Sequence, residues 1–216
     1  AFGGDTIPNN YTGKTESWSG GTWTEVADLN TARLGPGGSG IYTSALAFGG
    51  TTSAPVAPGR QSITESWNGT SWTEVSDLNT ARLDVMGGGI STASWAAGGN
   101  VDGASNATEI WNGSAWTTSP ATLNTARSQG SGTGTYTAAI VIGGSPGPTA
   151  ATETFNGTSW TEVSDLNTAR RLLAASGVQT SALVAGGDPS PANAKTETWD
   201  GTSWTEVTDL NTGRRG

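Results

Sequence analysis

One stretch of sequence recurs five times and decides what this chain can fold into. Residues 67–82 read W-N-G-T-S-W-T-E-V-S-D-L-N-T-A-R, and near-copies begin at Trp18, Trp111, Phe155 and Trp199. Consecutive copies from Trp67 onward start 44 residues apart, and Trp18 precedes Trp67 by 49 residues. A unit of this size cannot bury a core alone and needs its neighbours, so the repeat predicts one array over residues 1–216. We place the five units at residues 1–33, 34–82, 83–127, 128–170 and 171–216.

Short β-branched and aromatic segments, separated by glycines, predict strands and no helices. In the third unit these segments are 85–90, 93–97, 107–111 and 115–118. Asn-Gly or Asp-Gly stands between the third and fourth segments of four units, which predicts a tight hairpin with positive φ at both positions. Four antiparallel strands in each unit of ~44 residues predict an all-β fold of about five β-propeller blades. Glycine, alanine and serine of the first two strands should lie nearest the crowded axis.

The first blade is predicted to be incomplete. Ala1-Phe2-Gly3-Gly4 matches only the end of a second strand, and the sequence stops at Arg214-Arg215-Gly216, where a further first strand would begin. Three explanations stay open: an incomplete blade, a segment of a longer chain, or a strand supplied by a neighbouring subunit. The chain begins with Ala1 and not with Met, which favours a processed product or an excerpt.

The order of motifs within each unit resembles the kelch repeat along the whole chain. An apolar strand ends in Gly-Gly, a Trp or Phe follows, then a second Trp and an Arg. The Gly-Gly pairs are 3–4, 49–50, 98–99, 143–144 and 186–187, and the second tryptophans are Trp23, Trp72, Trp116, Trp160 and Trp204. The WD40 repeat fits less well, since Trp199-Asp200 lies in a turn and the chain has no histidine for a Gly-His motif. The nearly identical units, rich in Thr, Ser, Gly and Asn, are similar to kelch-like repeat proteins of bacteria and bacteriophages.

Charge and composition exclude several classes of function. The net charge is −8, and the 10 basic residues form no stripe, so neither nucleic acid nor an anionic membrane surface is an expected partner. No apolar run approaches the ~18 residues of a membrane span. The chain has no Cys and no His, which removes the usual nucleophile partners and zinc ligands. We therefore expect no catalytic residues, no metal site and no cofactor.

Two sets of repeated residues could carry chemistry or hold the array together. Each repeated Glu should pair with a repeated Arg, or with backbone N–H groups, at a blade boundary, because every junction needs the same fastening. The alternative is a ring of charges that lines a channel. The two sets are Glu16, Glu65, Glu109, Glu153 and Glu197, and Arg33, Arg82, Arg127, Arg170 and Arg214. The repeated tryptophans should fill the space between blades, although an exposed ladder that stacks on sugar rings is possible.

The connections between the second and third strands are the parts that vary most among units. They are residues 5–14, 51–62, 100–106, 145–150 and 188–195. Loops on a rigid scaffold usually carry recognition, whereas neutral drift is the simpler explanation of their variation. The binding residues that this face predicts are Tyr11, Lys14, Arg60, Gln61, Asp102 and Lys195. The two longest loops, 5–14 and 51–62, are expected to form the main contact.

The sequence therefore predicts a binding or structural module and not an enzyme. The resemblance implies a recognition or decoration element of a virion, such as a tail fibre, or of a cell surface. Its partner would be a protein or glycan surface that the variable loops contact, and assembly with other subunits is compatible with the incomplete blade. The alternative is a carbohydrate-active or oxidase-like kelch propeller enzyme. Fold alone cannot decide between them.

Overall fold

The computed structural model describes residues 1–6, 10–52, 59–189 and 193–215. In these ranges the chain forms strands β1 to β20, and helical geometry is confined to Gly59. The all-β prediction is confirmed.

Four of the units each form one four-stranded antiparallel sheet. The second unit contains β5 (Gly37–Ile41), β6 (Ser44–Phe48), β7 (Thr64–Trp67) and β8 (Trp72–Val75). The third contains β9 (Met86–Ile90), β10 (Ala93–Ala97), β11 (Thr108–Trp111) and β12 (Trp116–Thr118). The fourth contains β13 (Ser131–Thr135), β14 (Ala138–Ile142), β15 (Thr152–Phe155) and β16 (Trp160–Glu162). The fifth contains β17 (Ala174–Val178), β18 (Ser181–Ala185), β19 (Thr196–Trp199) and β20 (Trp204–Val207).

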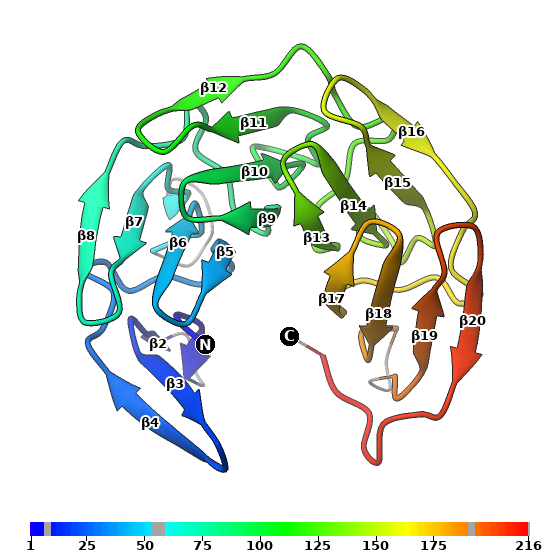
Figure 1. Cartoon of the computed structure of the whole chain (residues 1–216), viewed down its shortest axis with the longest axis horizontal. Helices are drawn as coiled ribbons and strands as arrows, with labels where there is room; N and C mark the ends of the chain where they lie inside the picture. The colour runs from blue at the N-terminus through cyan, green and yellow to red at the C-terminus, as the bar shows by residue number, and fades with distance from the viewer. Residues whose placement is uncertain (7–9, 53–58, 190–192, 216) are drawn as a thin grey trace.

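The first unit has only the outer half of such a sheet. β3 (Thr15–Ser19) pairs with β4 (Thr22–Val26), and the short strands β1 (Asp5–Thr6) and β2 (Asn10–Tyr11) form a separate hairpin. An isolated bridge between Phe2 and Thr15 is what remains of a second strand. The sheets follow one another around an axis in a propeller-like arrangement, but the arc stays open between β3–β4 and β17–β20 (Figure 1).

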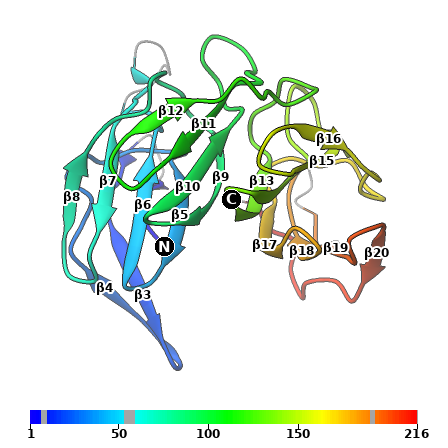
Figure 2. The same cartoon turned by 45° about the horizontal axis from the view of Figure 1, so that its top comes forward.

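The first strands of the four complete sheets, β5, β9, β13 and β17, lie side by side around the axis (Figures 1 and 2). They surround a hollow of ≈ 370 Å³ that is lined mainly by glycines. The glycines let neighbouring sheets approach: a Cβ on Gly87 would stand 2.5 Å from the Phe48 ring, and one on Gly132 would stand 2.4 Å from the Trp95 ring. The prediction of small residues at the centre is confirmed for the glycines of the first strands, whereas among the described residues no alanine and no residue of a second strand lines this hollow.

The core of this molecule lies between the sheets and not within them. Four apolar clusters are present, and each draws its buried residues from two neighbouring units. In one of them Trp95 of the third unit packs edge to face on Trp160 of the fourth, with 5.7 Å between ring centroids. A single unit could not bury these side chains, which is why the repeat specifies an array.

The Asn-Gly and Asp-Gly hairpins between the third and fourth strands are wider than the sequence predicts, whereas the first unit, in which Ser19 pairs with Thr22, has a two-residue connection. Trp67 pairs with Trp72, so the connection has four residues, 68–71, and not two. Only the glycine of the Asn-Gly pair has positive φ, 93° at Gly69. The Asn68 Oδ1 instead accepts hydrogen bonds at 2.9 Å from the backbone N–H groups of Thr70 and Ser71. Asparagine thus closes the loop with its side chain, as in an Asx-turn.

Candidate functional site

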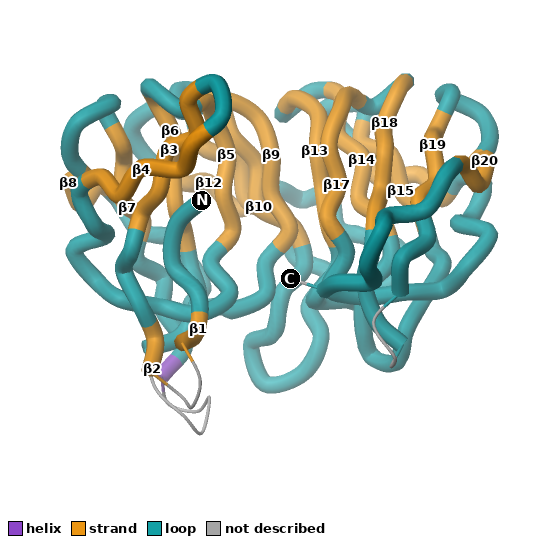
Figure 3. The backbone as a smooth tube through the Cα atoms, turned by 90° about the horizontal axis from the view of Figure 1, so that it is seen from below, coloured by secondary structure: helices purple, strands orange, loops and turns teal. Residues whose placement is uncertain are grey.

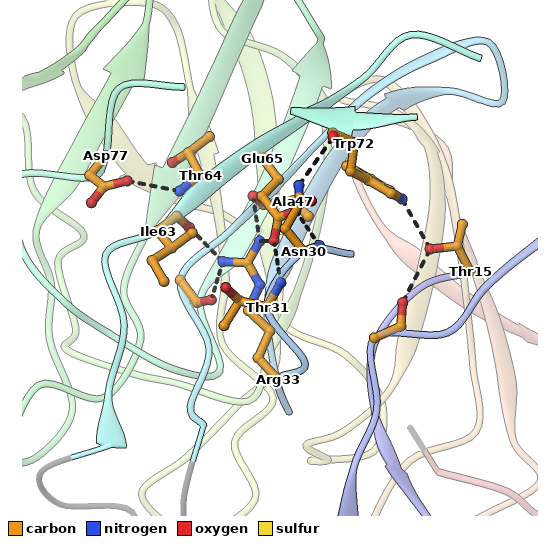
Figure 4. Close-up of polar contacts among 12 residues, drawn as sticks. Thr15, Asn30, Thr31, Arg33, Ala47, Ile63, Thr64, Glu65, Trp72 and Asp77 are labelled. Atoms are coloured by element: carbon orange, nitrogen blue, oxygen red, sulfur yellow. Dashed lines mark hydrogen bonds and ion pairs between the residues drawn. The ribbon is translucent and has the colours of Figure 1, made fainter. Parts of the chain in front are cut away.

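The arginine at the end of each of the first four units extends into the next unit, where a buried glutamate and backbone carbonyl groups bind it. Figure 4 shows the junction between the first two units. Arg33 Nη2 donates to Glu65 Oε1 at 3.0 Å, and Nη1 donates to the carbonyl oxygens of Ile63 at 2.6 Å and Gly49 at 3.1 Å. The Arg33 and Glu65 side chains are both fully buried. We call this arrangement the junction clasp.

An asparagine and a tryptophan complete the junction clasp. The backbone N–H and the side-chain amide of Asn30 donate to Glu65 Oε2 at 2.7 and 2.8 Å, and the amide also donates to the Trp72 carbonyl at 3.1 Å. In the opposite direction, Trp72 Nε1 donates to Thr15 Oγ1 of the preceding unit at 3.0 Å. Both oxygens of the buried carboxylate therefore have hydrogen-bond partners.

The junction clasp recurs at all four boundaries between units. Its ion pairs are Arg33–Glu65, Arg82–Glu109, Arg127–Glu153 and Arg170–Glu197. Burial lowers the pKa of each of these arginines below its usual value, and the facing carboxylate opposes that shift. A buried pair of this kind is costly to break, because the remaining charge has no partner. The structural interpretation of the repeated Glu and Arg is confirmed at these four boundaries.

The Gly-Gly pairs hold the clasp arginines in place. The backbone N–H of Gly50 donates to the Arg82 carbonyl at 2.8 Å, and Gly187 does the same for Arg214. A Cβ on Gly49 would stand 2.5 Å from that Arg82 oxygen, and φ of Gly49 is 70°, so only glycine fits. The two most constant motifs of the repeat therefore act on the same arginine.

The first Glu and the last Arg of the two series are exceptions. Glu16 and Arg214 are exposed, and within the described residues neither side chain forms an ion pair. The tryptophans of the first unit, Trp18 and Trp23, are exposed as well, whereas the other eight are buried. The expectations that each repeated Glu pairs with an Arg and that the repeated tryptophans fill the space between blades are thus wrong at the two ends of the array, where no unit of the structure covers these side chains.

The variable loops leave the scaffold between two fixed anchors. From the second unit on, the start of each loop bridges to the residue after the clasp arginine of the preceding unit, as between Thr51 and Leu34. At the end, the Gln61 N–H donates to Gly50 O, and Ser105, Thr149 and Asn193 make the equivalent bonds. Figure 3 shows β1, β2 and these loops on one side of the molecule, with the strand hairpins on the other. We call the first side the loop face.

The six predicted binding residues lie on or beside the loop face, and four of them are paired with other parts of this chain. Arg60 Nη1 pairs with Asp102 at 2.8 Å, which joins the loops of the second and third units. Lys14 and Lys195 stand at equivalent places and pair with Glu25 and Glu206. The other two are Gln61, whose amide donates to Thr52 Oγ1 and Gly59 O, and the half-buried Tyr11.

The expected main contact, formed by loops 5–14 and 51–62, falls partly on residues 7–9 and 53–58, which lie outside the described residues. The described part of loop 51–62 is joined to loop 100–106 through Arg60: Nη2 donates to Asn100 Oδ1 at 3.2 Å, in addition to the Asp102 pair. Asp102 itself is 85% exposed in its side chain. These two loops therefore act as one polar surface.

A polar network near the axis was not predicted from the sequence. The Gln129 amide donates to Asp84 Oδ2 at 3.1 Å, and Arg171 Nη1 donates to Gln129 Oε1 at 3.4 Å. Arg171 and Arg215 both pair with the buried Asp188 at 3.0 Å. Burial raises the pKa of Asp84, which the Gln129 hydrogen bond partly opposes. These residues lie one or two positions after the repeated Arg or at the start of a variable loop. The change of residue type among units at these positions was the only sign in the sequence that they could have a role of their own.

Neither a metal site nor a membrane-spanning helix occurs in the described part of the chain. No group of three or more acidic side chains there is placed to hold a metal ion. None of its helical segments has the length and apolar character needed to cross a bilayer. No protein-family model matches the sequence, and no curated protein matches it.

Proposed function

We propose that this chain is a kelch-like β-propeller that works as a non-enzymatic recognition or decoration module of a virion or cell surface. Its loop face binds a protein or glycan surface, and its sheets and junctions serve as scaffold. The observation that carries the proposal is that loops of different length and composition leave one constant scaffold from equivalent anchors on one side of the molecule.

The anchors explain how the loops differ while the scaffold stays the same. From the second unit on, each loop runs from a residue that bridges to the preceding unit to a residue whose N–H donates to the carbonyl oxygen of the second glycine of the Gly-Gly pair. Between these two anchors the second unit has residues 52–60, and the fourth unit has only residues 146–148. The backbone polar groups at both ends are satisfied whatever lies between them. Variation is thereby confined to positions where it costs no packing, which is the arrangement of recognition loops on a rigid fold.

The junctions support a scaffold role for the other repeated polar residues. The buried Glu and Arg side chains are engaged with each other and with backbone groups at each of the four boundaries. A catalytic site needs groups that differ from their copies and that can reach a substrate. The repeated Glu and Arg of the junctions do not meet this requirement, and the unit-specific polar groups that can contact a partner, such as Asp102, lie on the loop face.

Exchange of loops between units tests the proposal. Residues 52–60 and 101–104 are each replaced by the residues 146–148, Pro-Gly-Pro, so that the anchors at 51, 61, 100 and 105 are kept. The labelled chain is then incubated with a glycan array and with intact bacterial cells of several surface types. Binding should fall, while the melting temperature stays within a few degrees, because the carboxylate of the lost Arg60–Asp102 pair is 85% exposed and such a solvent-screened pair contributes about 0–1 kcal/mol.

A matched control changes the opposite side of the molecule. Thr70, Thr158 and Thr202 are exposed residues of the strand hairpins, and their joint replacement by Ala should leave binding unchanged. Retained binding in the loop exchange, together with loss in this control, would place recognition on the hairpin side and refute the proposal.

A further inference from the structure

Three exposed hairpins contain an asparagine whose side-chain carbonyl oxygen is bound by backbone N–H groups. These hairpins join the third and fourth strands of the second, third and fourth units, on the side opposite the loop face (Figure 3). Asn68 Oδ1 accepts hydrogen bonds from the N–H groups of Thr70 and Ser71, both at 2.9 Å. Asn112 and Asn156 accept the equivalent pair of bonds, also at 2.9 Å. We call these three residues the hairpin asparagines.

The amide nitrogen of each hairpin asparagine is free, and so is the backbone nitrogen that follows it. Within the described residues, Nδ2 of none of the three donates a hydrogen bond to the chain. Each hairpin asparagine precedes a glycine, and the N–H groups of these glycines donate no backbone hydrogen bond in that part of the chain either. A glycine has no Cβ to crowd its own nitrogen.

The asparagines of the junction clasps have the opposite arrangement. Asn79 Nδ2 donates to Glu109 Oε2 at 2.9 Å and to the Trp116 carbonyl at 3.1 Å, so its amide nitrogen is held. The residue that follows, Thr80, is β-branched and crowds its backbone nitrogen. The clasp asparagines are Asn30, Asn79, Asn124 and Asn167, and a threonine follows each of them. Both sets of asparagines are exposed, so hydrogen bonding and the following residue distinguish them.

The fifth unit has an aspartate at the place of the hairpin asparagines. Asp200 Oδ1 accepts hydrogen bonds from the N–H groups of Thr202 and Ser203, both at 2.8 Å. The backbone hydrogen bonds from Ser203 and Thr202 lower the pKa of Asp200, because they favour its charged form. Gly201 has φ of 95°, close to the 93° of Gly69. The hairpin therefore holds a carboxylate in the same loop as an amide.

We propose that the three hairpin asparagines are sites of a spontaneous covalent modification that converts each of them to aspartate or isoaspartate. The nitrogen of the following glycine loses its proton and attacks the asparagine Cγ, so that a new N–C bond closes a five-membered ring. Negative charge develops on Oδ1 in this step. The N–H groups that already bind Oδ1 stabilise that charge, as preorganised donors do in an oxyanion hole.

Loss of ammonia and addition of water complete the modification. The bond from Cγ to Nδ2 breaks, and the amide nitrogen takes up a proton and leaves as ammonia. Water then adds to one of the two ring carbonyl groups, and the bond from that carbonyl to the glycine nitrogen breaks. Opening at Cγ restores the original main chain as aspartate, whereas opening at the backbone carbonyl gives isoaspartate. Each conversion consumes one water and adds one negative charge to the hairpin side.

Incubation of the folded chain at mildly alkaline pH, followed by proteolysis and mass spectrometry, tests the proposal. Each hairpin asparagine should convert at least ~10-fold faster than any clasp asparagine, which is less than the ~100-fold effect of one oxyanion donor in an enzyme. Asp200→Asn creates a fourth hairpin asparagine before Gly201. It should convert at a rate similar to the other three, because the same two backbone donors face it.

A pair of variants at Thr70 separates the effect of the donors from that of the Asn-Gly dipeptide. Thr70→Pro removes one of the two N–H groups that bind Asn68 Oδ1, and Thr70→Ala keeps it. Conversion of Asn68 should slow at least ~10-fold in the Pro variant and stay unchanged in the Ala variant. Asn112 and Asn156 of the same molecules should keep their rates, which shows that both variants are folded.

Three results would each overturn the proposal. The first is a folded chain in which the hairpin asparagines stay unmodified over an incubation of weeks. The second is conversion of the hairpin and clasp asparagines at the same rate, which would place the reaction in the unfolded chain. The third is an Asn68 rate that Thr70→Pro leaves unchanged, since the donors would then have no part in the reaction.

Discussion

The interior junctions and the two outer edges of this molecule are made of nearly the same sequence but have different environments. Trp67 is 5% exposed and Trp72 is 6% exposed, whereas Trp18 and Trp23 in the same text are more than half exposed. Glu65 accepts hydrogen bonds from Arg33, Asn30 and Thr31, whereas the Glu16 carboxylate is exposed. Burial in a repeat array is thus a property of the neighbour and not of the unit.

Stability should be distributed in the same way. In an array of this kind it is a sum of terms within units and terms between neighbours, so a unit with one neighbour is held by fewer contacts. The first unit has two strands in its sheet and one junction, and the third has four strands and two junctions. Matched substitutions inside and at the edges measure this difference.

The largest difference is expected at the tryptophans. Trp116→Ala should reduce the free energy of unfolding by about 3–5 kcal/mol, because it removes a side chain packed on Phe48 and Trp111 and leaves a cavity. Trp23→Ala, at the equivalent place in the first unit, should cost less than about 1 kcal/mol. Urea denaturation measures both. Equal costs would mean that the first unit is covered in solution.

A smaller difference is expected at the clasp carboxylates. Glu109→Gln should cost about 2–3 kcal/mol, since it leaves the buried Arg82 charge without a counterion while keeping the shape of the side chain. Glu16→Gln should be nearly neutral in the monomer, because Glu16 is exposed there. A neutral Glu109→Gln would show that the clasp contributes hydrogen bonds but no net electrostatic stabilisation. Thermal and urea unfolding of the two variants decide this.

The threonines offer a test in which the two regions should respond with opposite sign. Thr152→Val should cost about 1–2 kcal/mol, because the buried Trp204 N–H loses its acceptor. Thr196→Val should be neutral or stabilising by up to about 1 kcal/mol, because the hydroxyl it removes is buried and without a partner. Destabilisation by Thr196→Val would indicate that its hydroxyl has a hydrogen-bond partner in solution.

The smallest effect concerns pH and the axial network. Burial raises the pKa of Asp84 above its ordinary 3.8, so the folded state binds this proton more tightly than the unfolded state. The contribution of this proton to the free energy of unfolding is fully present below the pKa that Asp84 has in the unfolded chain. It is lost as the pH rises through the pKa that Asp84 has in the folded chain. Asp84→Asn should flatten this fall and leave the amide contact to Gln129 possible. A pH series of urea unfolding curves in which the variant loses stability with pH as steeply as the unmodified chain would contradict the assignment.

The repeat predicted the features that recur at every junction. The strand segments, the Gly-rich centre, the buried tryptophans and the Glu–Arg pairs follow from requirements that each unit must meet, so five copies give the same answer. The 44-residue spacing of Glu65, Glu109 and Glu153 shows that the same side chain is needed at each boundary. A polar residue that is repeated this closely can be assigned to the scaffold from its spacing alone.

The features that the sequence did not predict depend on what surrounds a residue. Glu16 and Arg214 match their series in sequence, but only the three-dimensional order shows that each lacks a neighbour. Asp84, Gln129 and Arg171 have no shared motif, and their contacts arise because equivalent positions converge at the axis. The loop of the Asn-Gly hairpin has four residues because the Asn68 side chain accepts hydrogen bonds from the N–H groups of Thr70 and Ser71. The Asn-Gly dipeptide alone does not distinguish this loop from a two-residue turn.

Because every junction clasp has the same direction along the chain, the number of units in the array can change. Every clasp arginine points to the following unit and every indole N–H of the clasp points back to the preceding one, so all boundaries are interchangeable. If recombination deleted residues 83–127 as a block, Arg82 would meet Glu153 where it now meets Glu109, and Trp160 would meet Thr64 where Trp116 now does. Gain or loss of whole units therefore leaves each remaining boundary with a full set of partners, and selection on arc length can proceed without a loss of local stability.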